Sequence, residues 1–289
     1  MELRGKTIAV LGGKTGLLGQ ALVKALTAAK AKPKPLSSKD CDIVDPGSVE
    51  RVLNKIDPDV LINAAAYTQV DLAEEQEEVA FALNATAPPL LAAAAARRGI
   101  PFLHYSTDFV FSGNRTTPYT VYDNPGAFSV YGISKAEGEK NLIALGYDGT
   151  LIIRTSWLFG PDKMNFVKKI ITLATERNTL KVVDDQTGSP SYTPDVAANS
   201  IKLLEKDATG IFHLANSGTA TWFDLASEAV RLAGLPCTVE PIPTSGYPTP
   251  AVRPAYSVLD LTRFIQTTGE TPRHWKDALK EYINQEKDS

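Results

Sequence analysis

The stretch GGKTGLLG, residues 12 to 19, decides the fold of this chain. It follows an apolar run, TIAVLG at residues 7 to 12, and precedes a helical pattern from about Leu18 to Ala29. An apolar run, a glycine-rich turn and an amphipathic helix in this order predict the first unit of an α/β fold. The turn itself is compatible with two kinds of nucleotide site.

A phosphate-binding P-loop requires a glycine five residues before Gly13-Lys14-Thr15, and that position is Ile8. The spacing Gly13, Gly16, Gly19 between a strand and a helix instead matches a dinucleotide-binding turn. Free N–H groups at the start of the helix would bind the pyrophosphate. The residues expected to contact it are Gly13, Thr15, Gly16, Leu17, Leu18 and Gly19.

Apolar runs continue to alternate with helical patterns through the first half of the chain, which predicts crossover units and a parallel sheet. The expected strands lie at 59–65, 101–107 and 150–157, and the expected helices at about 79–98, 131–145 and 165–178. The second strand, near residues 32 to 36, contains two prolines, so it is either very short or an edge strand. The fold class is therefore a Rossmann-type, doubly wound parallel sheet.

The chain is expected to divide near residue 158. Residues 1–158 would form the dinucleotide-binding domain, and residues 159–289 mainly a smaller C-terminal substrate-binding lobe. That remainder mixes short strands at 180–185 and 210–215 with loops and three helices, the last near 272–285. Some of its segments are expected to return to the Rossmann sheet.

Composition narrows the class of protein further. The 289 residues carry a net charge of -3, which gives no general attraction to nucleic acid or to an anionic membrane. Cys41 and Cys237 have no metal or redox spacing and suit a reducing compartment. We recognise no signal peptide and no apolar run of membrane-spanning length, so we expect a cytoplasmic protein. The three isolated histidines suggest no metal site.

The choice of nucleotide depends on the region after the second strand. Dinucleotide sites often place an acid about 20 residues after the glycine turn to hold the ribose 2′-hydroxyl. Here KPKPLSSK, residues 32 to 39, contains cations and no acid, which favours a 2′-phosphate and hence NADPH, with NADH possible. Asp42 and Ile43 are expected to flank the adenine, although Asp42 could equally be a loop or capping residue.

YGISK, residues 131 to 135, places Tyr131 and Lys135 four positions apart on one helical face. A nearby ammonium favours the phenolate, so the pair can exchange a proton with a carbonyl or alcohol oxygen. Thr107 ends the strand before this helix, at the sheet edge where such folds bind ligands. We therefore expect Thr107, Tyr131 and Lys135 to be catalytic.

These motifs together make the chain resemble the extended short-chain dehydrogenases/reductases and, within them, the dTDP-4-dehydrorhamnose reductase family. The resemblance covers nearly the whole length, and its most specific stretches are AAAYTQVD (64–71), RTSW (154–157) and DQTGSP (185–190). It implies NAD(P)H-dependent reduction of the 4-keto group of a dTDP-4-dehydro-6-deoxyhexose, by a monomer or homodimer. By the same resemblance, Ala65, Ala66, Tyr67, Thr68 and Tyr105 would contact the cofactor, and Val70, Thr107, Asp108 and Trp157 the nucleotide sugar.

The chain also departs from that family. Ala127 and Ser129 stand where relatives usually have Pro and Asn, and Gln20 and Ala21 follow Gly19 where some relatives begin a magnesium-linked dimer site. Phe109 after Thr107-Asp108 removes the acid that related dehydratases use. An epimerase, a 4-ketoreductase for another nucleotide deoxysugar, and a regulatory subunit like that of methionine adenosyltransferase remain alternatives.

Overall fold

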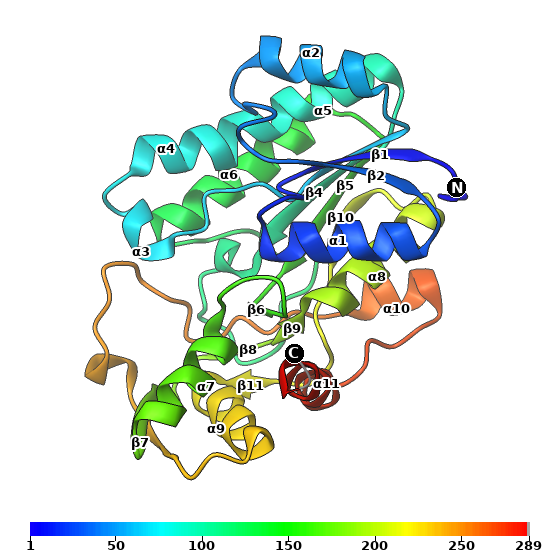
Figure 1. Ribbon diagram of the computed structural model, residues 1–289. Coiled ribbons are helices and arrows are strands. Elements are labelled where there is room, and N and C mark those ends of the chain that lie inside the picture. Colours follow the sequence, from blue (N-terminus) through cyan, green and yellow to red (C-terminus); the bar gives the residue numbers. More distant parts are fainter. Residues whose placement is uncertain (288–289) are drawn as a thin grey trace.

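A computed structural model describes residues 1–287 and is built on one central sheet of six parallel strands (Figure 1). The strand order is β10-β5-β4-β3-β1-β2, and every pairing in the sheet is parallel. The expected doubly wound α/β fold is confirmed. The strands are β1 (Thr7–Leu11), β2 (Lys32–Leu36), β3 (Val60–Asn63), β4 (Phe102–Thr107), β5 (Thr150–Thr155) and β10 (Gly210–His213).

Helices cover both faces of this sheet (Figure 1). Because side chains alternate along a strand, Leu103 and Tyr105 of β4 join one hydrophobic cluster while Phe102 joins the other. The first cluster includes side chains of α1 (Leu17–Ala28), α8 (Thr193–Glu205) and α10 (Thr262–Thr268). The second includes side chains of α2 (Pro46–Ile56), α5 (Ala87–Arg98) and α6 (Val130–Leu145).

The proline-containing strand β2 is the edge strand next to β1. The Lys32 N–H donates to the Lys6 carbonyl oxygen at 2.8 Å, so alternate residues of β2 face β1. The backbone nitrogens of Pro33 and Pro35 therefore face the open side of the sheet. Because no strand pairs there, their lack of an N–H group costs no hydrogen bond of the sheet. This explains how a poor strand sequence still forms five residues of strand.

The helix expected near residues 79–98 is a longer composite run, Glu77–Arg98, of α4 (Glu77–Phe81), a π-helical turn η1 (Ala82–Thr86) and α5. An 18-residue window of this 22-residue run has a mean hydropathy of 1.5, enough to cross a membrane by length and composition. The expectation that no segment reaches this length is therefore corrected. Half of the apolar window is buried inside the protein, where α5 packs on the sheet.

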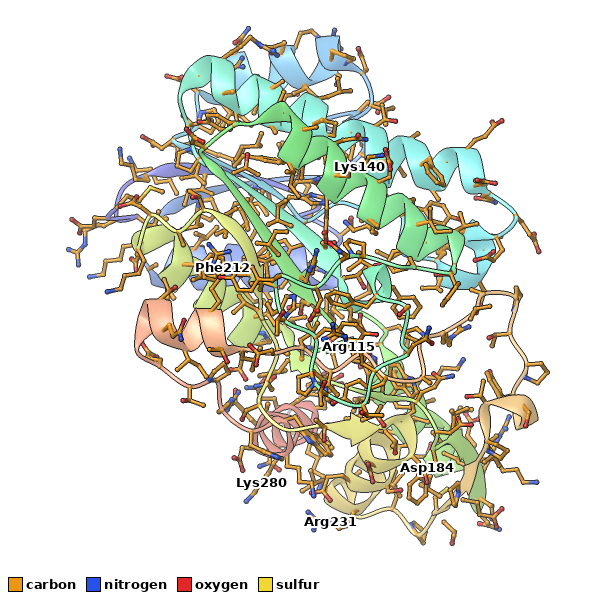
Figure 2. The ribbon with its side chains drawn as sticks, turned by 180° about the vertical axis from the view of Figure 1, so that it is seen from behind. Arg115, Lys140, Asp184, Phe212, Arg231 and Lys280 are labelled. Carbon is orange, nitrogen blue, oxygen red and sulfur yellow. The ribbon has the colours of Figure 1, made fainter. Side chains whose placement is uncertain are left out.

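Part of the chain after residue 158 forms a second, smaller lobe below the sheet in Figure 1. In the opposite view, Lys140 on α6 lies in the upper half of the molecule and Arg231 on α9 (Trp222–Ala233) at its lower end (Figure 2). Trp275 and Tyr282 are buried in the core of this lobe. Its elements include β6 (Leu158–Phe159), α7 (Phe166–Glu176), β7 (Thr179–Val183), β8 (Thr187–Gly188), β9 (Ser191–Tyr192), β11 (Ala220–Thr221), α9 (Trp222–Ala233), β12 (Thr238–Ile242), η3 (Thr244–Gly246) and α11 (Trp275–Lys287).

Within residues 159–287 the structure has five α-helices, α7, α8 (Thr193–Glu205), α9, α10 and α11, where the sequence predicted three. Strand β10 pairs with β5 in the main sheet, and α8 packs against α1. The elements after residue 158 thus contribute to both layers. We retain the division at residue 158 as a proposal about function, with residues 159–289 mainly binding substrate.

Candidate active site

A cavity of about 720 Å³ opens at the carboxyl ends of the parallel strands. The chain passes from β1 to β2 on one side and continues from β3 on the other, so the strand order reverses between β1 and β3. Ligands of open α/β sheets bind at this switch point. Gly12 after β1, Ala64 after β3 and Thr107 at the end of β4 all line the cavity.

The glycine turn is shaped by close packing as well as by ligand access. Gly12 has a φ of 79°, a left-handed conformation that side chains disfavour. A Cβ atom on Gly19 would lie 2.2 Å from the Gly12 carbonyl oxygen, so only glycine lets α1 start this close to the turn. Gly12 and Gly16 line the cavity, whereas Gly13 packs against β2 and Gly19 against the turn.

Lys14, the residue that made this turn resemble a P-loop, is bound elsewhere. Its Nζ donates to Asp40 Oδ1 at 2.8 Å, and the Ser37 N–H and hydroxyl also donate to Asp40. These bonds hold the pKa of Asp40 well below its usual range, with Lys14 the largest cause. Asp40 is thus an acid close to the end of β2. It lies three residues after Ser37, directly beyond the stretch 32–39 that contains no acid.

Most of the residues expected to bind ligands line this one cavity. Three do not: Gly13 and Gly19, which pack beneath the turn, and Tyr67. Those that do are Thr15, Gly16, Leu17, Leu18, Asp42, Ile43, Ala65, Ala66, Thr68, Val70, Tyr105, Thr107, Asp108, Tyr131, Lys135 and Trp157.

Tyr67 is buried, and its hydroxyl donates to Gln76 at 3.0 Å. Its backbone is held by Asn84 of the π-helical turn: Asn84 Oδ1 accepts from the Tyr67 N–H at 2.9 Å, and Nδ2 donates to the Tyr67 carbonyl. Asn84 Nδ2 also donates to Ser134 on α6. The π turn therefore fixes the cavity wall at residues 65–68 through the backbone, a role that the sequence pattern did not reveal.

Tyr131 lies in the first turn of α6, which begins after the N-cap Ser129. Ser129, one of the two departures from the family pattern, thus has a capping role: its Oγ accepts from the Gly132 N–H at 3.2 Å. Burial raises the pKa of Tyr131 to about 12, and a hydrogen bond with the Thr107 hydroxyl opposes that shift. Tyr131 therefore carries its proton at neutral pH and faces the cavity beside Thr107.

Thr107 and Asp108 also make structural contacts beside the cavity. Thr107 caps the short helix η2 (Asp108–Val110), accepting from the Phe109 N–H at 3.2 Å. Asp108 is 1% exposed, and its carboxylate accepts from the hydroxyls of Thr107 at 3.0 Å and Ser257 at 2.6 Å. Burial raises the pKa of Asp108 to about 6. Asp108 is thus a buried ionisable group rather than a turn cap.

Lys135 is buried on α6 and turned toward β4. Its Nζ donates to the Tyr105 carbonyl oxygen at 2.6 Å and lies 3.2 Å from His104 Nε2. Burial lowers the pKa of Lys135 to about 8. The partners of the Lys135 Nζ atom are thus on β4, and burial is the largest cause of the raised pKa of Tyr131; the expected effect of Lys135 on Tyr131 stays a prediction.

With this geometry in place, the chain can be compared with known proteins. The sequence model of the RmlD substrate binding domain matches residues 7–287. The chain belongs to this family.

RmlD-family relatives match it over nearly their whole length. The dTDP-4-dehydrorhamnose reductase of Escherichia coli (strain K12) is 38% identical, over 96% of this chain and 97% of that protein. The dTDP-4-keto-6-deoxy-D-glucose reductase of Streptomyces niveus is 37% identical, over 92% and 93%. The resemblance to dTDP-4-dehydrorhamnose reductases inferred from sequence motifs is confirmed.

Solved structures of RmlD-family reductases agree. A dTDP-4-dehydrorhamnose reductase from Clostridium acetobutylicum ATCC 824 superposes with a TM-score of 0.93, at 39% identity over 97% of this chain and 99% of that one. The reductase from Bacillus anthracis strain Ames, solved in complex with NADP, also gives 0.93, at 32% identity and the same coverage.

In this RmlD-family chain, Trp157 forms part of the cavity wall on a strained backbone. Its φ is 46°, in the left-handed region, and its ring stacks on Trp222 with centroids 3.6 Å apart and planes 6° apart. A Cβ atom on Gly188 would lie 2.5 Å from the Trp157 ring, so that glycine leaves room for it. Backbone strain of this kind persists where the surroundings enforce it, often at ligand sites.

Several cavity residues were not predicted. Arg253 lines the cavity from the C-terminal lobe and pairs with Asp71 of α3 (Val70–Ala73) at 2.8 Å, which joins the two halves across its rim. Nothing in the sequence around Trp222 and Arg253 pointed to a cavity. Other unpredicted lining residues include Gly12, Ser37, Ser38, Ser106, Lys163 and Asn165.

Among residues 1–287, no group of three or more His, Cys, Asp or Glu side chains is placed to hold a metal ion. Gln20, at the position discussed for a magnesium-linked dimer, directs its amide to the carbonyl oxygens of Gly16 and Asp162. It therefore ties α1 to the loop before α7.

Proposed function

We propose that this protein reduces the 4-keto group of a dTDP-4-dehydro-6-deoxyhexose with NAD(P)H, converting dTDP-4-dehydrorhamnose to dTDP-L-rhamnose. The observation that carries the proposal is that Tyr131 and Thr107 line the same cavity as the glycine turn. A proton donor beside a nucleotide turn is what carbonyl reduction requires. The relatives from Escherichia coli and Streptomyces niveus are named as reductases of such substrates.

The residues present fit a dinucleotide. Gly12 and Gly16 expose backbone at the start of α1, whose N-terminus attracts a pyrophosphate. The buried hydroxyls of Ser106 and Thr155 line the cavity without a hydrogen-bond partner among the described residues, so a ligand can satisfy them. A bound nicotinamide would supply the hydride. A relative with a similar fold was solved with NADP.

Each catalytic residue then has a separate task. Tyr131 holds the proton that the carbonyl oxygen receives, and Thr107 orients that oxygen through its hydroxyl. Lys135 lines the same cavity and stabilises the Tyr131 phenolate once the proton has left. Because its pKa is about 8, the lysine is available as a cation near neutrality. Trp157, Val70 and Asp108 shape the substrate side of the cavity.

We propose NADPH as the preferred cofactor. Ser37 and Ser38, which follow β2, line the cavity where the adenosine ribose is expected. Asp40, the first acid after β2 in the sequence, already accepts bonds from Lys14 and Ser37, so it is less available to a ribose 2′-hydroxyl. Small hydroxyl side chains leave room for a 2′-phosphate, while NADH can still bind.

The remaining assignments complete the proposal. We propose a cytoplasmic monomer or homodimer that binds a nucleotide sugar, with neither nucleic acid nor a membrane as a partner. The second candidate is a 4-ketoreductase for another nucleotide deoxysugar, which the Streptomyces niveus relative supports by its name. An epimerase or a regulatory NADP-binding subunit has no comparable observation in its favour.

The test is to mix the protein with dTDP-4-dehydrorhamnose and either NADPH or NADH, follow loss of reduced nicotinamide absorbance, and identify the product by NMR. We expect stoichiometric oxidation, a dTDP-L-rhamnose product and higher catalytic efficiency with NADPH. A folded protein that binds NADPH but oxidises none of it would rule out the reductase. Turnover only with a different 4-keto sugar would establish the second candidate instead.

A further inference from the structure

The stretch DQTGSP, residues 185–190, carries part of the family resemblance, and the proposed reaction gives it no task. In the structure it passes against Trp157, whose ring lines the cavity. Thr187 and Gly188 form β8, and β8 pairs with β11, the strand that leads into Trp222 at the start of α9. The C-terminal lobe therefore brings Gly188 and Trp222 together around the Trp157 ring.

The Trp157 ring lies in a closely fitting slot. Its centroid is 3.6 Å from that of the Trp222 ring, and the two planes are 6° apart. A Cβ atom on Gly188 would lie 2.5 Å from Cε2 and 2.8 Å from Nε1 of Trp157, so the indole occupies the space that a side chain there would take. Because Trp222 covers one face of Trp157, only the opposite face and the ring edge are left for a ligand.

Trp222 is fixed by contacts of its own. Its Nε1 atom donates to Gln186 Oε1 at 3.2 Å, and Gln186 Nε2 donates to the Thr244 hydroxyl at 3.0 Å. Phe166 of α7 packs against the Trp222 ring, with centroids 4.6 Å apart. Gln186 is buried, and a buried amide needs partners, so its two bonds determine where the Trp222 indole lies.

The backbone of Trp157 is held by the same part of the lobe. Its φ of 46° lies in the left-handed region, which a residue with a bulky side chain adopts only when its surroundings enforce it. The Ser191 N–H donates to the Trp157 carbonyl oxygen at 3.2 Å, and the Ser156 hydroxyl donates to the Ser189 carbonyl oxygen at 2.5 Å. Both the backbone and the ring of Trp157 are therefore fixed from outside its own strand.

We propose that Trp222, held by Gln186, is a positioning residue for nucleotide-sugar binding: it keeps the Trp157 ring against Gly188 and so presents one fixed indole face to the sugar. This inference rests on the proposed function, which puts Trp157 on the substrate side of the cavity. A ring that is already fixed loses little rotamer freedom when the ligand binds, so the stack raises the affinity for the sugar by preorganisation. Trp222 belongs to the C-terminal lobe and the glycine turn to the main sheet, so the affinity for NADPH is independent of Trp222.

The fixed ring can be observed without any ligand. The chain has three tryptophans, so protein labelled with fluorotryptophan gives three fluorine resonances, which single replacements assign. We expect one sharp Trp157 resonance in the wild type and a doubled or exchange-broadened one in Trp222→Ala, where the ring is free to leave the slot. A single sharp Trp157 resonance in Trp222→Ala would overturn the inference. This result is independent of the reductase assay.

Binding of dTDP-L-rhamnose, measured by calorimetry with NADP⁺ present, tests the consequence for the sugar. We expect Trp222→Ala to weaken this binding about tenfold or more, with the Kd for NADPH within about twofold of the wild type. Trp222→Phe retains an aromatic face and should recover most of the loss. Equal losses in the two variants, or an equal loss of NADPH affinity, would contradict the positioning role. A wild-type protein that binds no dTDP-L-rhamnose would count against the proposed function instead, and the fluorine resonances would then decide the inference.

A double-mutant cycle shows whether Trp222 acts through Trp157. In a Trp157→Ala background, Trp222→Ala should change the affinity for dTDP-L-rhamnose by no more than about twofold, because the ring that Trp222 positions is gone. A loss as large as in the wild-type background would mean that Trp222 contacts the sugar itself, and it would overturn the positioning role.

Trp275→Phe is the matched control. Trp275 is buried in the same lobe, where its Nε1 atom donates to the Thr219 carbonyl oxygen at 3.1 Å. This variant should change stability without changing the affinity for dTDP-L-rhamnose by more than about twofold.

Gly188→Ala tests the slot from its other side if Trp222→Ala does not fold. The added Cβ atom would lie 2.5 Å from the Trp157 ring and displace it. We expect about tenfold weaker binding of dTDP-L-rhamnose and a shifted or broadened Trp157 resonance. Unchanged affinity in this variant would count against the proposal.

Discussion

At the scale of single residues, Asp108 shows how position in the chain misleads and burial decides. An aspartate at the start of a turn often caps that turn, but here the neighbouring Thr107 is the cap. The Asp108 carboxylate is enclosed with the Thr107 and Ser257 hydroxyls as its partners. Ser257 is 149 residues away in sequence, so no local pattern could have predicted this environment.

The raised pKa of Asp108 makes the stability of the protein depend on pH. Because the folded value of about 6 exceeds the unfolded value near 3.8, the folded state binds the proton more tightly. The stabilisation is complete below pH 3.8 and is lost as pH rises through 6. Relative to Asp108→Asn, the wild-type free energy of unfolding should fall by about 1 to 3 kcal/mol between pH 4 and 7.

Urea unfolding of both proteins at several pH values measures this difference. The asparagine keeps an acceptor for Thr107, and the Ser257 hydroxyl can rotate to accept from its amide. A difference between the two proteins that stays constant from pH 4 to 7 would show that Asp108 does not titrate in this range.

At the scale of elements, the sequence predicted what local spacing controls. The glycine turn, the strands of the main sheet and α6 follow from hydrophobic period and capping residues. The π-helical turn at Ala82–Thr86 could not be predicted, because its residues continue an ordinary helical pattern. Contacts from Asn84 to Tyr67 and Ser134, far along the chain, accompany the extra residue in that turn.

The packing of α1 against the glycine turn gives a prediction at this scale. Gly19→Ala would place a Cβ atom 2.2 Å from the Gly12 carbonyl oxygen, so the helix must move away from the turn. We expect a loss of about 1 to 3 kcal/mol in the free energy of unfolding and at least tenfold weaker NADPH binding. Urea unfolding and fluorescence titration measure these quantities.

Gly246→Ala is the matched control, since a Cβ atom there meets nothing closer than 3.6 Å. It should change the free energy of unfolding by no more than about 0.5 kcal/mol. Wild-type NADPH affinity in Gly19→Ala would mean that the close approach of α1 is not needed for the cofactor.

At the scale of the whole molecule, the site is assembled from segments that the fold alone brings together. Gly12, Thr107, Tyr131 and Trp157 come from different elements of the chain and line one cavity. The sheet edge was predictable, since carboxyl ends of parallel strands meet there. The contribution of the C-terminal lobe through Trp222 and Arg253 was not, because it depends on how that lobe packs over the edge.

The account depends most on Tyr131 as the proton donor, and turnover of Tyr131→Phe with NADPH and dTDP-4-dehydrorhamnose tests this most directly. The phenyl ring keeps the packing of the residue but has no proton to give. Tyr147→Phe, which loses a hydroxyl that donates to the Ile100 carbonyl oxygen, is the control and should retain normal turnover. We predict a fall of about 10² to 10⁴-fold in kcat for Tyr131→Phe, with NADPH affinity preserved. Turnover within a few-fold of the wild type would contradict the assignment.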